Sequence, residues 1–268
     1  MKSVELTGWQ VASFRSGVAT IIFLLLLPEV RRRPPLKVLA AGAVYAVTMV
    51  LFVLSNKLTT AASAIFLQAT APLWVVLLSP WFLGERVRGR DVVYMLVLAG
   101  GLGCFFVGID PVSTTAPNPL LGNVLAALSG LSWAVTIMAL RALGRRSGEG
   151  GEGGSWGPAS ALWGSIFASL GCLPLALPLG PTRAQDWLIV GFLGVFQIAV
   201  AYIFLLRGIE RVPALEASLL LLLEPVLNPV WAWAVHGERP GAWSLGGGAI
   251  LLVATLVKTW LDSRRPSP

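Results

Sequence analysis

The sequence predicts an all-α integral membrane protein built from two inverted five-helix repeats, with nine transmembrane helices in this chain where ten are expected. Three observations support this fold class. The composition is the first, because 56% of the 268 residues are hydrophobic and only 12% are charged, against about 25% charged residues in soluble domains. The second is a series of apolar runs of membrane-spanning length. The third is a segment that occurs twice.

Nine apolar runs follow one another along the chain, and about 20 residues span a bilayer as an α-helix. Only helices and closed barrels satisfy the backbone in lipid, and these runs are too continuously apolar for barrel strands. Each run is therefore expected to be one helix. The predicted helices cover residues 9–27, 38–54, 61–83, 92–109, 120–140, 159–179, 187–206, 213–235 and 243–261.

The loops between these runs differ in charge. Fifteen of the 20 Lys and Arg residues lie in the first, third, fifth and seventh loops or near the C-terminus, whereas the opposite side has Lys2, Lys57, Arg183 and Arg239. Cytoplasmic loops carry the excess of basic residues in membrane proteins. We therefore expect a multi-pass protein of the cell membrane (plasma or inner), with its C-terminus cytoplasmic and its N-terminus external. The net charge of +7 is an orientation signal and does not indicate nucleic-acid binding.

The repeated segment covers residues 61–87 and again residues 214–240, with seven of 27 aligned positions identical. In each copy a proline stands twelve residues before a Gly-Glu-Arg triplet. Five helix crossings separate the two triplets, and because five is odd the copies are expected to face opposite sides of the membrane. Such inverted repeats are common in secondary transporters. The structural repeat motif consists of Pro72, Gly84, Glu85, Arg86, Pro225, Gly237, Glu238 and Arg239.

The triplets are expected to have a structural role, in which Glu85 and Glu238 fix the helix ends and pair locally with Arg86 and Arg239. The repeat divides the chain into two predicted domains, residues 1–109 and 119–262, the second with a flexible Gly-rich cytoplasmic loop at 142–157. Five helices per repeat predict ten in all. The shortfall lies in the first repeat, where an external N-terminus without a signal sequence also indicates a missing first helix. A truncation or a wrongly chosen start codon would explain it.

These features resemble the drug/metabolite transporter superfamily, specifically its EamA-type members. The resemblance rests on two five-helix halves and on the proline and Gly-Glu-Arg triplet in the fourth helix of each half; Ala-Ser-Phe-Arg at 12–15 is also similar to the start of the family's second helix. It implies a secondary active transporter that moves a metabolite, amino acid or drug-like solute by alternating access, with export the expected direction and no cofactor. Because the family's first helix lines the central cavity, a non-transporting or channel-like scaffold is the alternative.

Other function classes are disfavoured. The chain has no Gly-x-x-x-x-Gly-Lys-[Ser/Thr] loop, so ATP is not expected to drive transport directly, and a proton, ion or substrate gradient is expected instead. An intramembrane enzyme would need catalytic or metal-binding groups at membrane depth. The only histidine, His236, is predicted outside the bilayer, and Cys104 and Cys172 lie in separate apolar runs. We therefore expect no catalytic residue and no metal site.

Glu224 is the leading candidate for substrate binding. It is predicted midway along its helix, where a carboxylate costs at least about 2.5 kcal/mol and by default faces a cavity or a partner. Asn228 follows four residues later and shares its face. Together with carbonyls freed by Pro225 and Pro229, these side chains are expected to hold a cation, an ammonium group or a proton. The alternative is a protonated Glu224 hydrogen-bonded to a neighbouring helix.

Four further candidates each have a structural alternative. Gln68, whose carbonyl is freed by Pro72, binds substrate or forms a helix–helix hydrogen bond. Arg15 binds an anionic substrate or, as we favour, snorkels to the outer interface. Trp133 and Tyr202 stack on a substrate or pack within the bundle.

Small residues recur at four-residue spacing and predict close contacts between helices. The expected partners are a small-molecule solute and the lipid bilayer, with proton or ion coupling and a homodimer left open. The small-residue sets are Ala126/Gly130/Ala134, Gly164/Ala168/Cys172 and the cluster Gly100, Gly101 and Gly103.

Overall fold

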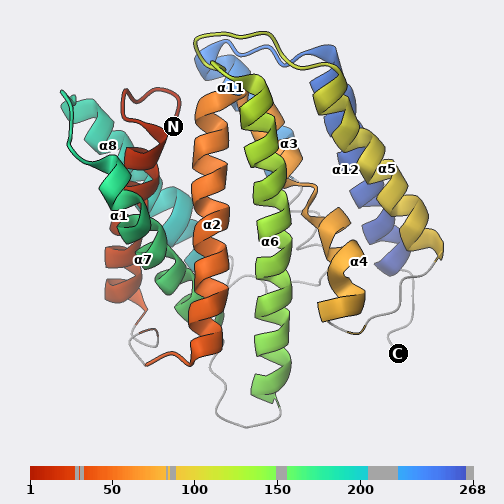
Figure 1. Cartoon of the computed structure of the whole chain (residues 1–268), viewed down its shortest axis with the longest axis horizontal. Coiled ribbons are helices and arrows are strands. Elements are labelled where there is room, and N and C mark those ends of the chain that lie inside the picture. The colour runs from red at the N-terminus through yellow and green to blue at the C-terminus, as the bar shows by residue number, and fades with distance from the viewer. Residues whose placement is uncertain are drawn as a thin grey trace.

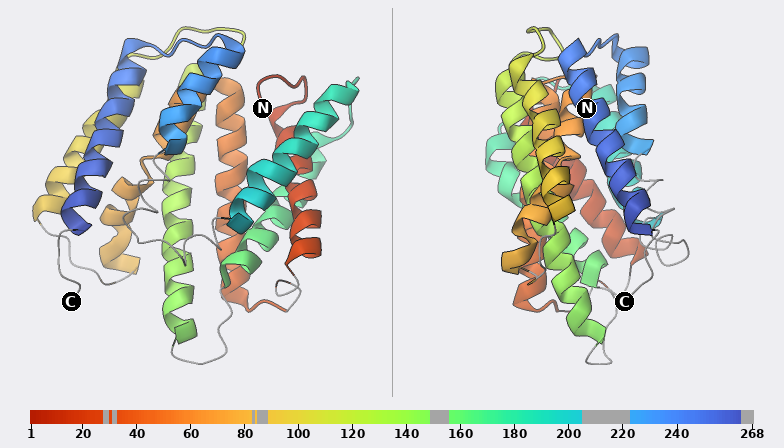
Figure 2. Two further views of the ribbon diagram at one scale, coloured as in Figure 1. Left: turned by 180° about the vertical axis from the view of Figure 1, so that it is seen from behind. Right: turned by 90° about the vertical axis from the view of Figure 1, so that its right-hand side faces the viewer.

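The computed structural model describes residues 1–27, 30, 33–82, 84, 89–148, 156–204 and 223–263, with the backbone alone for 144–148, 262 and 263. Within this part every regular element is a helix, and the helices run up and down between two ends of one bundle (Figure 1). Figure 2 shows the same arrangement from two further sides. The end that holds the N-terminus in Figure 1 is called the upper end below.

The helices follow the predicted runs, which confirms the all-α membrane fold. Eight of the described stretches are long and apolar enough to cross a membrane. The predicted run 213–235 is described only from Leu223, and residues 213–222 lie outside the described part. The elements are α1 (Gly8–Leu26), α2 (Leu36–Leu58), α3 (Ala61–Gln68), α4 (Ala71–Phe82), α5 (Gly89–Val107), α6 (Pro119–Gly148), α7 (Trp156–Ala176), α8 (Ala184–Phe192), the π-helix η2 (Leu193–Val200), α11 (Leu223–His236) and α12 (Ala242–Ser263).

Two of the predicted runs are not single regular helices. The run 61–83 turns at residues 69 and 70 between α3 and α4, immediately before Pro72, which has no N–H to continue the hydrogen-bond ladder. The hydroxyl of Thr70 donates to the carbonyl of Leu67 at 2.6 Å and satisfies one of the groups left at this break. The run 187–206 changes from α8 to the wider π-helix η2 at Leu193. Segments of π-helix are rare and often lie at functional sites.

The predicted Gly-rich loop at 142–157 is shorter than expected. Helix α6 continues through Gly148, and α7 already begins at Trp156. The reason is that residues 141–146, Arg-Ala-Leu-Gly-Arg-Arg, are mostly good helix formers, and a helix that satisfies its own backbone can extend beyond the lipid. The predicted loop therefore begins before α6 ends and ends after α7 has begun.

Small residues bring several helices into contact, as predicted. Helix α2 packs between α6 and α7, α1 packs on α7 and η2, and α5 pairs with α12. A β-carbon at Gly164 would lie 2.8 Å from the carbonyl oxygen of Gly42, and one at Gly130 would lie 2.8 Å from that of Leu67. Gly101 likewise faces α12, at Gly247. The rest of the glycine cluster does not fit the prediction.

Gly100 and Gly103 have open space where a β-carbon would be. The reason is that α5 turns only one face towards α12, and residues on its other faces do not share that contact. One glycine of the three therefore serves helix packing.

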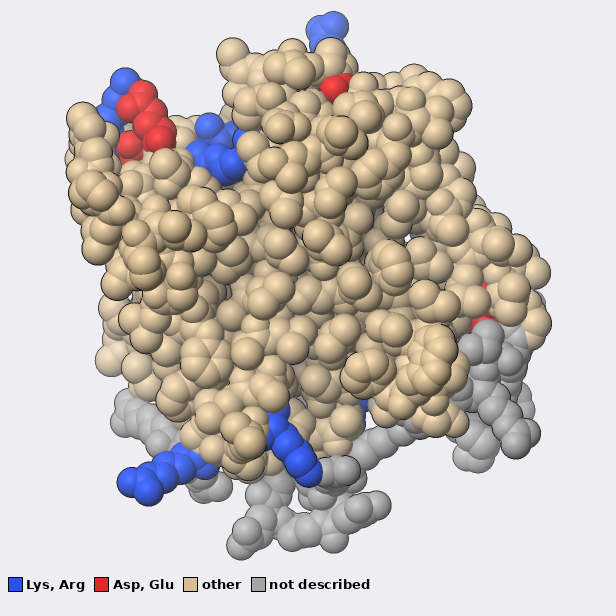
Figure 3. Space-filling view, in the orientation of Figure 1, with Lys and Arg blue, Asp and Glu red and all other residues tan. Residues whose placement is uncertain are grey.

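The surface has the character of a lipid-facing protein. Side chains such as Leu25, Leu96 and Val253 are 58–68% exposed although they are large and apolar. In Figure 3 the visible Lys and Arg side chains gather at the two ends and leave an uncharged band between them. Membrane proteins place charge in this way because the hydrocarbon core excludes it. The chain is thus a multi-pass membrane protein.

Candidate functional site

A cavity of about 200 Å³ opens between α2, α3, η2 and α11, beside the first residues of the chain. Its wall combines apolar side chains with amides and charged groups, a combination typical of sites for polar small molecules. The polar residues that line it are Lys2, Asn56, Gln197, Glu224, Asn228 and His236.

Glu224 and Asn228 both line this cavity, as their predicted common face requires. The carboxylate of Glu224 is exposed there and forms no hydrogen bond with another residue in the described part of the chain. The predicted alternative, a Glu224 bonded to a neighbouring helix, is therefore not seen in that part. Asn228 donates from Nδ2 to the carbonyl of Ala61 at 3.1 Å, which ties α11 to the first residue of α3.

Arg15 does not snorkel, so that expectation is wrong. Its side chain is 2% exposed because α2, α7 and η2 surround this part of α1. One guanidinium nitrogen donates to Oε1 of Gln197 at 3.0 Å, and the sulfur atoms of Met1 and Met49 lie 3.9 Å from the two terminal nitrogens. Gln197 lines the cavity, so Arg15 lies directly behind its wall.

Gln68 forms a helix–helix hydrogen bond, as one of its two predicted roles requires. Its Nε2 donates to the hydroxyl of Ser129 on α6 at 2.9 Å, and that hydroxyl donates to the carbonyl of Thr48 on α2 at 3.2 Å. Thr48 in turn bonds Ser132 at 2.8 Å. Gln68 is not among the residues that line the cavity. Its place is in a polar ladder that joins α3, α6 and α2.

Trp133 and Tyr202 both pack against Tyr45. Their ring centroids lie 6.2 Å and 6.0 Å from that of Tyr45, and Phe23 lies 6.2 Å from Tyr202. These rings form a core cluster with α1 and α7 side chains and are absent from the cavity wall. Packing is thus the role that the geometry shows for both.

The two glycines of the repeat motif share one backbone conformation. Gly84 has φ 66° and Gly237 has φ 64°, the only positive values among the described residues. Gly84 follows α4 at the lower end and Gly237 follows α11 at the upper end (Figure 1). Left-handed glycines commonly end helices, and the N–H of Gly237 donates to the carbonyl of Trp233 at 2.9 Å. Glu85 and Arg86 lie outside the described residues.

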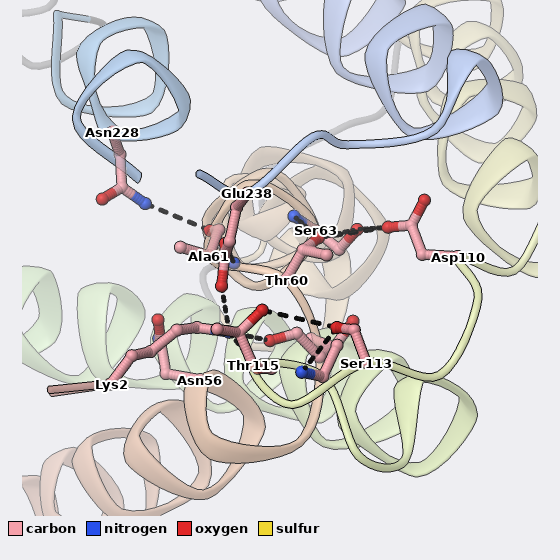
Figure 4. A network of polar contacts seen from close by, with 12 residues as sticks. Lys2, Asn56, Thr60, Ala61, Ser63, Asp110, Ser113, Thr115, Asn228 and Glu238 are labelled. Atoms are coloured by element: carbon pink, nitrogen blue, oxygen red, sulfur yellow. Dashed lines mark hydrogen bonds and ion pairs between the residues drawn. The ribbon is translucent and has the colours of Figure 1, made fainter. Parts of the chain in front are cut away.

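Glu238 does not pair with its neighbour Arg239, contrary to the prediction. One carboxylate oxygen lies 2.7 Å from Nζ of Lys2, and the other accepts the backbone N–H of Ala61 at 2.9 Å (Figure 4). The reason is that Glu238 is buried at the N-terminus of α3, whose free N–H groups attract a carboxylate, while Arg239 is exposed. Burial lowers the pKa of Lys2, and the ion pair with Glu238 opposes that shift.

Asp110, which the sequence interpretation did not single out, is the centre of the upper-end network. Its Oδ2 accepts hydrogen bonds of 3.1 Å from the hydroxyls of Thr60, Ser63 and Ser244, and its Oδ1 accepts the N–H of Gly241 at 2.8 Å (Figure 4). The carboxylate thus joins the start of α3 to the start of α12.

Two signals in the sequence could have identified the residues of the Asp110 network and of the cavity wall that the sequence interpretation missed. Thr60 and Ser63 are typical of a helix start, and the acidic residue that follows the apolar run 92–109 stands where it can reach such a start. Gln197 and Asn56 are polar residues within or next to predicted spans, which by default face a cavity or a partner.

Comparisons with known proteins show the family and the fold. The model of the EamA-like transporter family matches residues 1–108 and 120–260. The pseudopaline exporter CntI of Pseudomonas aeruginosa strain UCBPP-PA14 is 25% identical over 266 residues, which cover 95% of this chain and 87% of the exporter. An uncharacterized transporter of Archaeoglobus fulgidus is 27% identical over 243 residues, or 88% of this chain and 82% of that protein. A crystal structure with 20% identity superposes with a TM-score of 0.62 and covers 98% of this chain and 91% of its own, which shows a shared fold.

Proposed function

The chain belongs to the EamA-like transporter family, and we propose that it is a secondary active transporter that exports a small solute from the cell by alternating access. Membership in a transporter family and similarity to an exporter support the direction. The upper end is then external and the lower end cytoplasmic. The orientation follows the excess of basic residues that the sequence places in the lower loops.

The observation that carries this proposal is the polar cavity. Its wall comes from α2 and α3 of the first predicted repeat and from η2 and α11 of the second, so a solute there would touch both halves. Transporters of inverted-repeat architecture bind substrate at the interface between repeats and open it to either side by rocking one half against the other. The two family matches and the two left-handed glycines at opposite ends support such a repeat here.

Glu224 is the proposed proton-carrying group of this cycle. Its carboxylate is open to the cavity, where it can bind a proton or a cationic group of the solute in turn. Two hydrogen bonds hold the end of α11 against the start of α3 at the upper end, from Nδ2 of Asn228 to the carbonyl of Ala61 and from the N–H of Ala61 to the carboxylate of Glu238. Opening towards the outside would break both.

Glu224→Gln tests this mechanism in proteoliposomes with an imposed pH gradient. We expect gradient-driven solute flux to fall about tenfold or more, because the amide neither carries a proton nor attracts a cationic group of the solute. The measurement combines mass spectrometry of released amino acids, nucleosides and amines with a pH-sensitive dye inside the vesicles.

The matched control is Glu5→Gln, because Glu5 is 56% exposed in its pair with Arg183 at the same end and outside the cavity wall. That variant should transport like the original chain. Unchanged flux and pH dependence in Glu224→Gln would remove this carboxylate from the mechanism. Absence of any flux by the unaltered protein would favour the scaffold instead.

A further inference from the structure

Arg15 presents a buried positive charge that the described residues do not neutralise. Within the described part of the chain, each hydrogen bond of its guanidinium is to a neutral group, namely the amide oxygen of Gln197 and the sulfur atoms of Met1 and Met49. Its Nε is buried and has no hydrogen-bond partner among the described residues. In the described part of the chain no carboxylate lies within ion-pair distance of it. Buried charges in proteins are paired as a rule, because an isolated ion is expensive to desolvate.

The guanidinium is one side chain away from the cavity. Gln197 contacts Arg15 with its amide oxygen and also lines the cavity. The backbone of η2 approaches α1 very closely here, since a β-carbon at Gly194 would lie 2.6 Å from the carbonyl oxygen of Arg15. This close crossing fixes η2 against α1, with Gln197 in contact with the guanidinium and also on the cavity wall. Rotation of that amide would open a path to Arg15.

A solute in the cavity is therefore close to two groups of opposite charge. Glu224 lines it with a carboxylate that no other described residue bonds. Arg15 bonds Gln197, and no described residue accepts the N–H of its Nε. A solute that carried one negative and one positive group would satisfy both, and guanidinium binds carboxylates with particular strength and geometry.

We propose that Arg15 and Gln197 form a carboxylate-binding subsite of the cavity and that the transported solute is a zwitterion, whose protonated amine binds Glu224. The inference rests on the proposed transport function and names its substrate class. On binding, the amide of Gln197 turns from accepting the bond of Arg15 to donating its own N–H to the solute carboxylate. Because Glu224 holds either the ammonium group or a proton, the zwitterion and the proton exchange at one site.

Gln197→Glu is the sharpest test, since it supplies Arg15 with a permanent carboxylate at the position of its present partner. Flux is measured in proteoliposomes with three matched mixtures: amino acids, their amides, which lack the negative charge, and their N-acetyl derivatives, which lack the positive one. The unaltered protein should move the amino acids at least about tenfold faster than either derivative mixture. In Gln197→Glu the amino-acid flux should fall to the level of the derivatives.

Thermal unfolding separates this effect from misfolding. Gln197→Glu should unfold at the original temperature or above it, because a buried charge gains a partner, and added amino acids should no longer raise that temperature. If Arg15 has only a structural role, the variant will be stable and its flux unchanged, which overturns the subsite. Equal or faster flux of amides, N-acetyl derivatives or nucleosides by the unaltered protein overturns the zwitterion while leaving the proposed transport intact.

Glu210→Gln and Glu216→Gln are the controls for an internal counter-ion, since both acids lie in the sequence outside the described residues. Each should retain the selectivity for amino acids. Loss of that selectivity in either variant, with Gln197→Glu unaffected, would identify an internal partner of Arg15 and refute the subsite. Transport of none of the mixtures, nor of any solute in the wider screen, would instead refute the transport function.

Discussion

Gly164→Ala is expected to destabilise the folded bundle by about 3 kcal/mol, because a single added methyl group overpacks the contact between α7 and α2. The new β-carbon would lie 2.4 Å from a ring carbon of Tyr45 and 2.8 Å from the carbonyl oxygen of Gly42. The ring can turn, but the carbonyl belongs to the backbone of α2, so the two helices have to separate. Thermal unfolding of the purified protein in detergent, followed by tryptophan fluorescence, measures the effect.

Gly171→Ala is the matched control on the same helix, with nothing within 4 Å of the added carbon. It should raise stability by up to about 1 kcal/mol, since alanine favours the helix over glycine. The two substitutions are chemically identical and are expected to act with opposite sign. Equal unfolding temperatures for both variants would show that α2 and α7 do not approach as closely as the structure shows.

Asp110→Ala is expected to cost about 3–5 kcal/mol, the loss typical when a buried charged hydrogen-bond centre is removed. Four donors lose their acceptor, among them the N–H of Gly241 and the hydroxyl of Ser244, both at the start of α12. Asp110→Asn should cost less, because an amide can still accept from Gly241 while its NH₂ faces hydroxyls that also accept. The unfolding temperature is expected to be lowest for Asp110→Ala, higher for Asp110→Asn and highest for the unaltered protein.

Glu5→Ala provides the comparison for Asp110, since its ion pair with Arg183 is exposed on both sides, 56% and 70%. Exposed pairs contribute only about 0–1 kcal/mol, so this variant should unfold close to the original temperature. An Asp110→Ala protein as stable as Glu5→Ala would mean that water replaces the carboxylate at little cost. The network would then not be what joins α3 to α12.

The helices could be predicted because each depends on a local property, the length of an apolar run. The break before Pro72 departs from the single helix expected there, although its cause, the missing N–H of proline, is local as well. The partner of Glu238 could not be predicted in this way, since Lys2 is at the other end of the chain and only the fold brings them together. Its neighbour Arg239 was the nearest cation in the sequence but points outward.

The candidate site was predicted in part for the same reason. Glu224 and Asn228 lie one turn apart, so their common face followed from helix geometry, and the structure places both on the cavity wall. The burial of Arg15 depends on which helices cover α1, a property of the assembled bundle. The π-helix that presents Gln197 leaves no signal in hydropathy, because a wider turn changes neither the length nor the apolar character of the run.

The pairing of α5 with α12 also affects the order in which the protein assembles during its synthesis. Helix α12 begins about half a chain length after α5 ends, so at ordinary elongation rates α5 waits on the order of ten seconds before its partner is synthesised. During that interval the face of α5 around Gly101 contacts lipid or the insertion machinery in place of Gly247. Completion of this pair is therefore among the last steps of biogenesis. A nascent chain that stopped before α12 would have α5 in the membrane without its partner helix.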